Sequence, residues 1–134
     1  MKHLLAGALL IVDDREDIRL AMKRYFSLYF EAVYVAATPN EAERMLREHP
    51  PSYLLCDYWL GDGFLPSTEY IPGWRKLAPN IKCVALMTGT KIAALGKTEY
   101  VDIVFQKPLE PNEVIKAFTN GELPDFDDVP DTAP

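Results

Sequence analysis

The sequence predicts an α/β protein in which helices cover both faces of a parallel sheet. Short apolar runs alternate along the chain with segments of helical periodicity, the pattern of repeated strand–helix units. The apolar runs are continuous, which is typical of strands buried on both faces. A length of 134 residues favours one domain with its own core. We therefore expect five strands and four or five helices, and no internal repeat is visible.

The first strand is expected at residues 8–12, and a helix follows within residues 15–30. Asp14 is the expected N-cap of this helix, with Asp17 three residues later. The start MKHLLAGALLIV resembles a signal peptide, but it runs into an acidic cluster instead of a cleavage site. It is also too short to span a bilayer. Five side chains fall on one face of the helix: Ile18, Met22, Tyr25, Phe26 and Tyr29.

The second unit pairs a strand at residues 32–37 with a helix that begins after Thr38. Thr38 is the expected N-cap, Pro39 occupies the first helical position, and Glu41 reaches back to the helix start. The helix turns Ala42, Met45 and Leu46 towards the core, and the Pro50–Pro51 pair ends it.

The third unit is less regular. A strand covers residues 53–60, at least as far as Asp57, and a Gly- and Pro-containing loop follows. Ile71, Trp74 and Leu77 indicate a helix with Trp74 in the core, but the Pro72–Gly73 pair should break or kink it.

The last two strands are expected at residues 82–89 and 100–108, with a short helical piece around 91–95 between them. A final helix over residues 110–121 carries Val114, Ile115 and Phe118 and is capped by Gly121. The domain then spans residues 1–121. The tail 122–134 is rich in Asp and Pro, which is typical of disorder or a linker remnant.

The composition excludes several classes of function. A formal net charge of −6 argues against nucleic-acid binding, which needs a basic surface, and fits a cytoplasmic protein without membrane insertion. Cys56 and Cys83 have neither metal-ligand nor redox spacing. We expect Cys56 to be a buried small hydrophobe that lies too far from Cys83 for a disulfide.

Chemically active side chains stand at the carboxyl ends of four predicted strands. Asp13 and Asp14 end the first, Asp57 the third, Thr88 the fourth and Lys107 the fifth. In open α/β sheets this edge holds the ligand. Three carboxylates together call for a hard divalent cation such as Mg²⁺, and a carboxylate can also attack phosphorus. Each residue alone has an ordinary explanation as a helix cap, loop acid or surface lysine, so the prediction depends on their convergence.

Four motifs at these strand ends, LLIVDDRED, LLCDYWLGDG, ALMTG and FQKP, resemble the receiver domain of bacterial response regulators over residues 8–120. The resemblance implies a flavodoxin-like sheet of order 2-1-3-4-5. It implies that Asp57 accepts a phosphoryl group from a sensor histidine kinase or a histidine phosphotransfer protein. Thr88 would hydrogen-bond the phosphoryl group after transfer, and Lys107 would pair with it.

The same resemblance implies a Mg²⁺ site. Asp14 matches the acid that binds the ion directly, and Asp13 the acid that usually acts through water. Asp57 and the backbone carbonyl of Trp59 would complete the set of protein ligands. We also expect the bulky Trp59 side chain to shield an acyl phosphate from water.

Three departures from the family pattern concern the output more than the chemistry. Val104 stands where the family usually has Tyr or Phe, and Phe105 should face the other side of the sheet. The stretch from Thr88 to Lys107 is about one helical turn shorter than usual, and Gly61 replaces a common proline. We therefore expect phosphorylation to be retained, and the sequence leaves open whether the usual Thr–aromatic switch operates.

The residues are also compatible with other functions. The chain could be a receiver-fold interaction module that phosphorylation does not control, or a receiver cut from a hybrid histidine kinase, and its output partner is unidentified. A Mg²⁺-dependent phosphohydrolase would need a second Asp two residues after the first-strand nucleophile. Arg15 and Glu16 occupy those positions, so we expect a signalling domain and not an enzyme.

Overall fold

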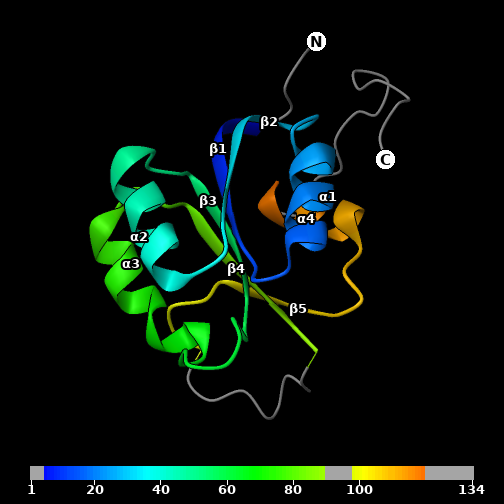
Figure 1. Ribbon diagram of the computed structural model, residues 1–134. Helices are drawn as coiled ribbons and strands as arrows, with labels where there is room; N and C mark the ends of the chain where they lie inside the picture. Colours follow the sequence, from blue (N-terminus) through cyan, green and yellow to red (C-terminus); the bar gives the residue numbers. More distant parts are fainter. Residues whose placement is uncertain (1–4, 90–97, 120–134) are drawn as a thin grey trace.

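The structure, a computed structural model, describes residues 5–89 and 98–119. Its centre is a five-stranded, all-parallel sheet with the strand order β2-β1-β3-β4-β5 (Figure 1). This order confirms the predicted 2-1-3-4-5 arrangement. The strands are β1 (Leu5–Val12), β2 (Phe30–Ala36), β3 (Tyr53–Asp57), β4 (Cys83–Thr88) and β5 (Ile103–Gln106).

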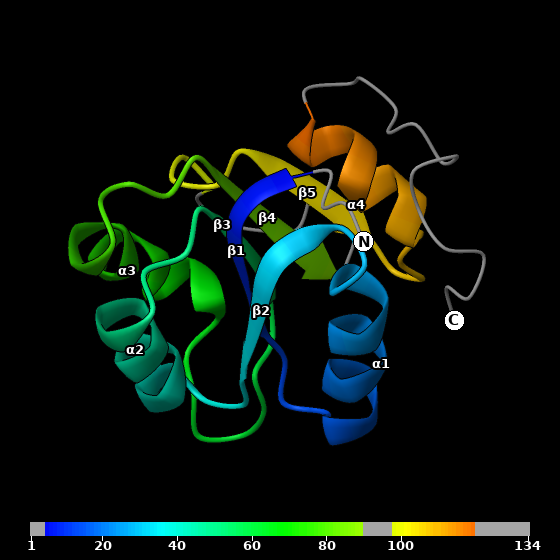
Figure 2. The same ribbon diagram turned by 90° about the horizontal axis from the view of Figure 1, so that it is seen from above.

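Helices cover both faces of the sheet, as the continuous apolar strands predict. Helices α1 (Glu16–Phe26) and α4 (Pro111–Phe118) lie on one face. Helices α2 (Pro39–Glu48) and α3 (Ile71–Leu77) lie on the other, which is clearest in Figure 2. A single 3₁₀ turn, Ser67–Glu69, precedes α3. The sheet is therefore doubly wound.

The sheet separates two hydrophobic cores. Successive side chains of a strand point to opposite faces, so Leu9 and Ile11 pack with α1 and α4. Leu10 and Val12 pack on the other side with α2 and α3. All four side chains are fully buried, which fixes the register of β1 in the middle of the sheet.

Helix α1 differs from its prediction at both ends. Its N-cap is Arg15, whose side chain makes no capping hydrogen bond, so the prediction of Asp14 as N-cap is wrong. The reason is local, because the Arg15 amide donates to the Asp13 carboxylate and the helix starts one residue later. The helix also ends at Phe26, well short of residue 30, because Phe30 already belongs to β2.

Helix α2 starts as predicted. The Thr38 hydroxyl accepts a hydrogen bond from the Glu41 amide at 3.2 Å. The Glu41 carboxylate reaches back to the Ala37 amide at 3.3 Å. Pro39 is the first helical residue, where its missing N–H costs nothing.

Helix α3 shows that the Pro72–Gly73 pair does not break the helix. Pro72 lies in the first turn, where no intrahelical donor is required, so the helix begins at Ile71 instead of kinking. Trp74 is buried in the core, as predicted. The predicted helical piece at 91–95, the Gly121 cap and the tail 122–134 lie outside the described residues. Among residues 5–89 and 98–119, no helix is long and apolar enough to cross a membrane.

Candidate functional site

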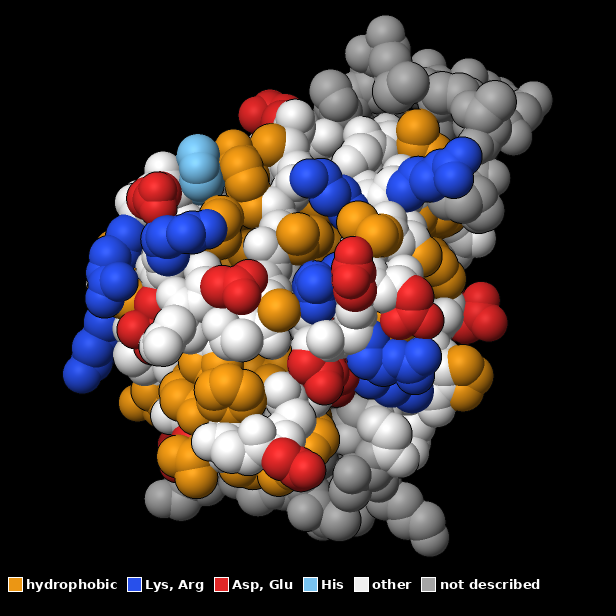
Figure 3. Space-filling view, in the orientation of Figure 1, with side chains coloured by type: hydrophobic (Ala, Val, Ile, Leu, Met, Phe, Trp, Pro, Cys, Tyr) orange, Lys and Arg blue, Asp and Glu red, His pale blue; other side chains and the backbone are white. Residues whose placement is uncertain are grey.

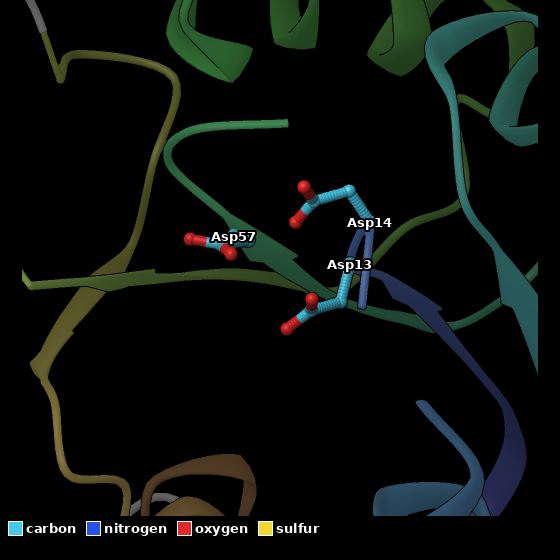
Figure 4. Close-up of side chains that lie close together, drawn as sticks. All are labelled: Asp13, Asp14 and Asp57. Carbon is cyan, nitrogen blue, oxygen red and sulfur yellow. The ribbon is translucent and has the colours of Figure 1, made fainter. Parts of the chain in front are cut away.

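Three carboxylates converge at the carboxyl edge of the sheet. Asp13 and Asp14 follow β1, and Asp57 ends the neighbouring β3 (Figure 4). One oxygen atom from each side chain lies within 4.8 Å of the other two. The cluster that the strand ends predict is therefore present in the fold.

Asp13 is fully buried and held at three of its atoms. Its amide donates to the Ala36 carbonyl at 3.0 Å, and its Oδ1 accepts from the Arg15 amide at 2.9 Å. Its carbonyl accepts from Nη1 of Arg19 at 2.9 Å. The remaining oxygen, Oδ2, is buried and has no hydrogen-bond partner among the described residues. Asp13 thus has a single carboxylate oxygen left for a ligand.

Asp57 is paired with the lysine of the fifth strand end. Nζ of Lys107 donates to Oδ2 of Asp57 at 3.0 Å. The Asp57 side chain is 8% exposed and the Lys107 side chain 37% exposed, so the carboxylate is buried and the ammonium meets solvent. On the other carboxylate oxygen, the Trp59 amide makes a long contact of 3.4 Å. The main chain of Trp59 therefore lies at the site.

The backbone around the site is tied across three strands. The Tyr58 amide donates to the Met87 carbonyl, and the Lys107 amide donates to the Thr88 carbonyl, both at 2.8 Å. Thr88 is almost fully buried at the end of β4, between the strand ends that carry Asp57 and Lys107. These bonds hold the carboxyl ends of β3, β4 and β5 side by side.

Burial and mutual repulsion act on the acids. Burial is the largest effect on Asp13 and raises its pKa, and the neighbouring charge of Asp57 raises it further. Burial likewise raises the pKa of Asp57, against the opposing effect of Lys107. A divalent cation would remove the repulsion between these carboxylates, and their hard oxygen atoms fit such an ion.

Two residues lie at the site although no pattern in the sequence indicates that they would be there. Gly61 has a φ of +107°, and a Cβ there would lie 3.4 Å from Oδ2 of Asp14, so the loop after β3 passes close to the acidic pair. The LGDG stretch predicts a loop, but it does not predict that this loop passes close to Asp14. Arg19 is the other residue. The helical pattern does not show that its side chain reaches back to the Asp13 carbonyl at the end of β1.

The departures seen in the sequence have structural counterparts. Val104 packs against the core under α2 and α3, whereas Phe105 packs against the core on the α1 side, so the two face opposite sides as predicted. Trp59, two residues after Asp57, is 49% exposed. Both cysteines are free, and burial raises the pKa of the Cys56 thiol. Cys83 lies beside Tyr53, three positions from Cys56 along β3, and no disulfide joins the two cysteines.

A groove of about 320 Å³ adjoins the site between α1 and the segment after β5. The groove is lined by three charged residues, Asp13, Arg15 and Lys107, and otherwise by apolar side chains. One end of it is therefore polar and the rest apolar. On the face shown in Figure 3, basic and acidic side chains are interspersed, and apolar ones gather near the start of α3. The apolar lining of the groove consists of Ile18, Ala21, Met22, Met87, Pro108, Leu109 and Pro111.

Comparisons with known proteins point to one fold. No protein-family model and no curated protein sequence matches the chain. A solved response regulator receiver domain (CheY-like) from Methylobacillus flagellatus has a TM-score of 0.75 at 20% identity, over 88% of this chain and 100% of that one. A CheY-like receiver domain protein from Methanospirillum hungatei has a TM-score of 0.70 at 24% identity, over 87% and 93%.

A third structure holds ligands. It is a response regulator protein from Burkholderia pseudomallei with a phosphorylated aspartic acid, a calcium ion and citrate. Its TM-score is 0.72 at 23% identity, over 82% of this chain and 65% of that chain. With the 2-1-3-4-5 parallel sheet, these likenesses show that this chain has the fold of the CheY-like response regulator receiver domains.

Proposed function

We propose that the protein is a phosphoacceptor receiver domain that takes a phosphoryl group onto Asp57 in a Mg²⁺-dependent reaction. The observation that carries this proposal is the pairing of Asp57 with Lys107 at 3.0 Å, within 4.8 Å of the acidic pair. A buried carboxylate at a strand end, with a lysine on one side and two acids on the other, suits phosphoryl transfer better than structural support.

The donor is the phosphohistidine of a sensor histidine kinase or a histidine phosphotransfer protein. An oxygen of Asp57 attacks phosphorus and forms a new P–O bond. The P–N bond breaks, and its electron pair stays on the imidazole nitrogen, which takes up a proton from solvent. The product is an aspartyl phosphate, and no oxidant or further reactant is needed.

The side chains around Asp57 would stabilise the transferred group. Lys107 already donates to Asp57, and its ammonium can follow the negative charge as it moves to the phosphoryl oxygens. Thr88, at the end of the neighbouring strand, would donate its hydroxyl to the same group. Lys107 also favours the ionised form of Asp57, which the attack requires, against the effect of burial.

The acidic residues fit a divalent cation. Oδ2 of Asp13 is a buried oxygen without a partner among the described residues, and Asp14 and Asp57 add two hard oxygen donors. Asp13, Asp14, Asp57 and the Trp59 carbonyl would hold Mg²⁺. When bound, the ion supplies positive charge that offsets the charge developing on the phosphoryl oxygens.

The partner would approach over the groove between α1 and the segment after β5. Its apolar lining lies next to Lys107 and Asp13, so a protein that docks there brings its phosphohistidine to the site. We infer a cytoplasmic signalling domain that relays its state by conformational change, with an output partner other than nucleic acid, and without a separate enzymatic activity.

Intact-mass measurement after incubation with a small phosphodonor and MgCl₂ tests the proposal. We expect one added phosphoryl group that hydroxylamine removes, and no addition when EDTA replaces the magnesium. Asp57→Asn should abolish the adduct, whereas Asp62→Asn is the matched control, because Asp62 is an exposed acid in the loop after β3. An adduct that persists in Asp57→Asn, or none on the wild type, would contradict the proposal and favour an interaction module.

A further inference from the structure

We propose that Arg19 is a positioning residue of the divalent-cation site. Its guanidinium holds the backbone of the acidic pair in the geometry that the cation requires. This inference rests on the proposed function, since it concerns the same cation, but it makes a separate claim about a residue that is not itself a ligand.

The contacts of Asp13 carry the argument. The amide, Oδ1 and the carbonyl of Asp13 each have one partner, at 3.0, 2.9 and 2.9 Å, and only Oδ2 is left for a ligand. The first two partners, Ala36 and Arg15, are backbone groups that the strand and the helix start supply. The third is a side chain, so Arg19 is the member of this set that a substitution can remove without altering the main chain.

The bond from Arg19 also affects Asp14. The Asp13 carbonyl belongs to the peptide unit that joins Asp13 to Asp14, so a donor that fixes this oxygen orients the backbone on both sides of it. Asp14 is exposed, and no hydrogen bond of its side chain appears among the described contacts. The position of its carboxylate therefore depends on the peptide that Arg19 holds.

Arg19 is well placed for this role. Its own amide donates to the Arg15 carbonyl at 3.0 Å, so it sits in the first turn of α1. That helix is anchored in the core by Met22 and Phe26. Arg19 as a residue is partly buried, and the bond from its guanidinium to a carbonyl is of the strong, charge-assisted kind.

The sign of the effect separates positioning from simple electrostatics. Arg19 is positively charged, so if it acted only through its charge it would repel a cation, and its removal would tighten cation binding. If it acts by positioning, its removal weakens binding, because the acidic pair must be reordered before it can bind the ion. The two effects have opposite directions.

The experiment measures Mg²⁺ affinity of the full chain by titration calorimetry, together with the unfolding temperature of the metal-free protein. The variants are Arg19→Gln, Arg19→Lys and the control Lys23→Gln. Lys23 lies one turn further along α1 and is exposed, so this control removes the same charge without touching Asp13. Arg19→Lys keeps the charge and a donor, and it remains informative if Arg19→Gln fails to fold.

We expect Arg19→Gln to weaken Mg²⁺ binding about tenfold, which corresponds to about 1.4 kcal/mol. Arg19→Lys should recover most of the affinity, and Lys23→Gln should leave it unchanged or slightly tighter. If Arg19→Gln lowers only the unfolding temperature and keeps the wild-type affinity, or binds more tightly, the inference is wrong while the cation site stands. If the wild type itself binds no Mg²⁺, the proposed function fails first.

Discussion

Trp59 exposes half of its side chain beside the carboxylate that we propose as the phosphoacceptor. We expect an indole at that position to exclude water from an acyl phosphate, whereas a small amide would admit it. We predict that Trp59→Asn shortens the lifetime of the phosphorylated protein severalfold. The decay of the intact-mass adduct after removal of the donor measures this lifetime. Trp59→Phe, which keeps an apolar ring, should decay much like the wild type, and equal lifetimes in all three proteins would contradict the shielding role.

Gly61 gives a second prediction at the scale of one residue. Its φ of +107° is a conformation that side-chain-bearing residues rarely adopt, so Gly61→Ala should lower the free energy of unfolding by about 1 kcal/mol or more. Urea denaturation measures the change. The control is Gly73→Ala in α3, where added methyl atoms meet nothing within 4 Å and alanine favours the helix, so stability should stay equal or rise.

Residues at strand ends could be predicted from the sequence, because a parallel sheet brings them to one edge whatever the details. Asp13, Asp57 and Lys107 meet there for that reason. The bond from Arg19 to the Asp13 carbonyl and the shift of the α1 cap to Arg15 could not be predicted. Both depend on hydrogen bonds between a side chain and a backbone atom, over six residues for Arg19 and Asp13 and over two residues for Asp13 and Arg15. Several such bonds compete at each position, so the sequence does not show which of them forms.

At the scale of elements, a small polar cluster ties α3 to the last two strands. Oδ2 of Asp102 accepts from the Val84 amide at 2.7 Å and from Arg75 at 2.8 Å, and Nε of Arg75 donates to the Tyr100 carbonyl at 2.9 Å. The cluster joins the first residues of β4, the segment before β5 and the face of α3. It therefore fixes how β5 enters the sheet.

Removal of the Asp102 side chain should weaken the attachment of the segment before β5 to β4 and α3. We predict that Asp102→Ala lowers stability by roughly 1 kcal/mol, since a backbone donor loses its partner in a half-exposed setting. Hydrogen exchange at the Val84 amide should accelerate more than exchange at amides of β1. Glu48→Ala, which breaks only the exposed pair with Arg44 on α2, should change stability by less than about 0.5 kcal/mol. Equal exchange at Val84 in wild type and variant would refute the link.

The elements differ in how well the sequence specified them. Helix α2 carries Thr38, Pro39 and Glu41 at consistent capping positions, so its start could be predicted to the residue. Helix α3 carries Pro72 in its first turn, where proline is favourable. One turn further along, the same residue would break the helix. The spacing of the apolar residues does not show whether Pro72 starts the helix or interrupts it. The choice depends on where the chain leaves the loop after β3.

For the whole molecule, the raised pKa values of Asp13 and Asp57 predict how stability depends on pH without a divalent cation. Both groups hold protons more tightly in the folded state than at their ordinary value of 3.8. Their contribution to stability is thus fully present below about pH 3.8 and is lost as pH rises through the folded-state pKa values. The acidic cluster therefore destabilises the metal-free protein at neutral pH.

Comparison of the wild type with Asp13→Asn isolates this effect. In EDTA at pH 7 the variant should be the more stable protein, by an amount of the order of 1 kcal/mol, and the difference should shrink towards pH 4. Addition of Mg²⁺ should reverse the order, because the cation binds only the folded wild type with all its carboxylates. Urea denaturation at both pH values measures this, and a pH-independent difference would refute the assignment.

The fold as a whole was more predictable than its details, since continuous apolar runs and the α/β alternation leave few arrangements of the sheet. The resemblance carried by four short motifs implied the strand order, and the structure confirms it. That resemblance rests on the side chains at the strand ends: Asp13, Asp14, Asp57, Thr88 and Lys107.

The division of the interior by the sheet has a consequence for how this chain tolerates change. Ile115 is buried on the α1–α4 side and Ile71 on the α2–α3 side, with the sheet between them. Helices that pack on opposite faces of a sheet share few neighbours, so the stability effects of truncating these two side chains should simply add. Sequence drift in one core then leaves the other undisturbed. The two halves can diverge at independent rates while the strand ends between them keep their chemistry.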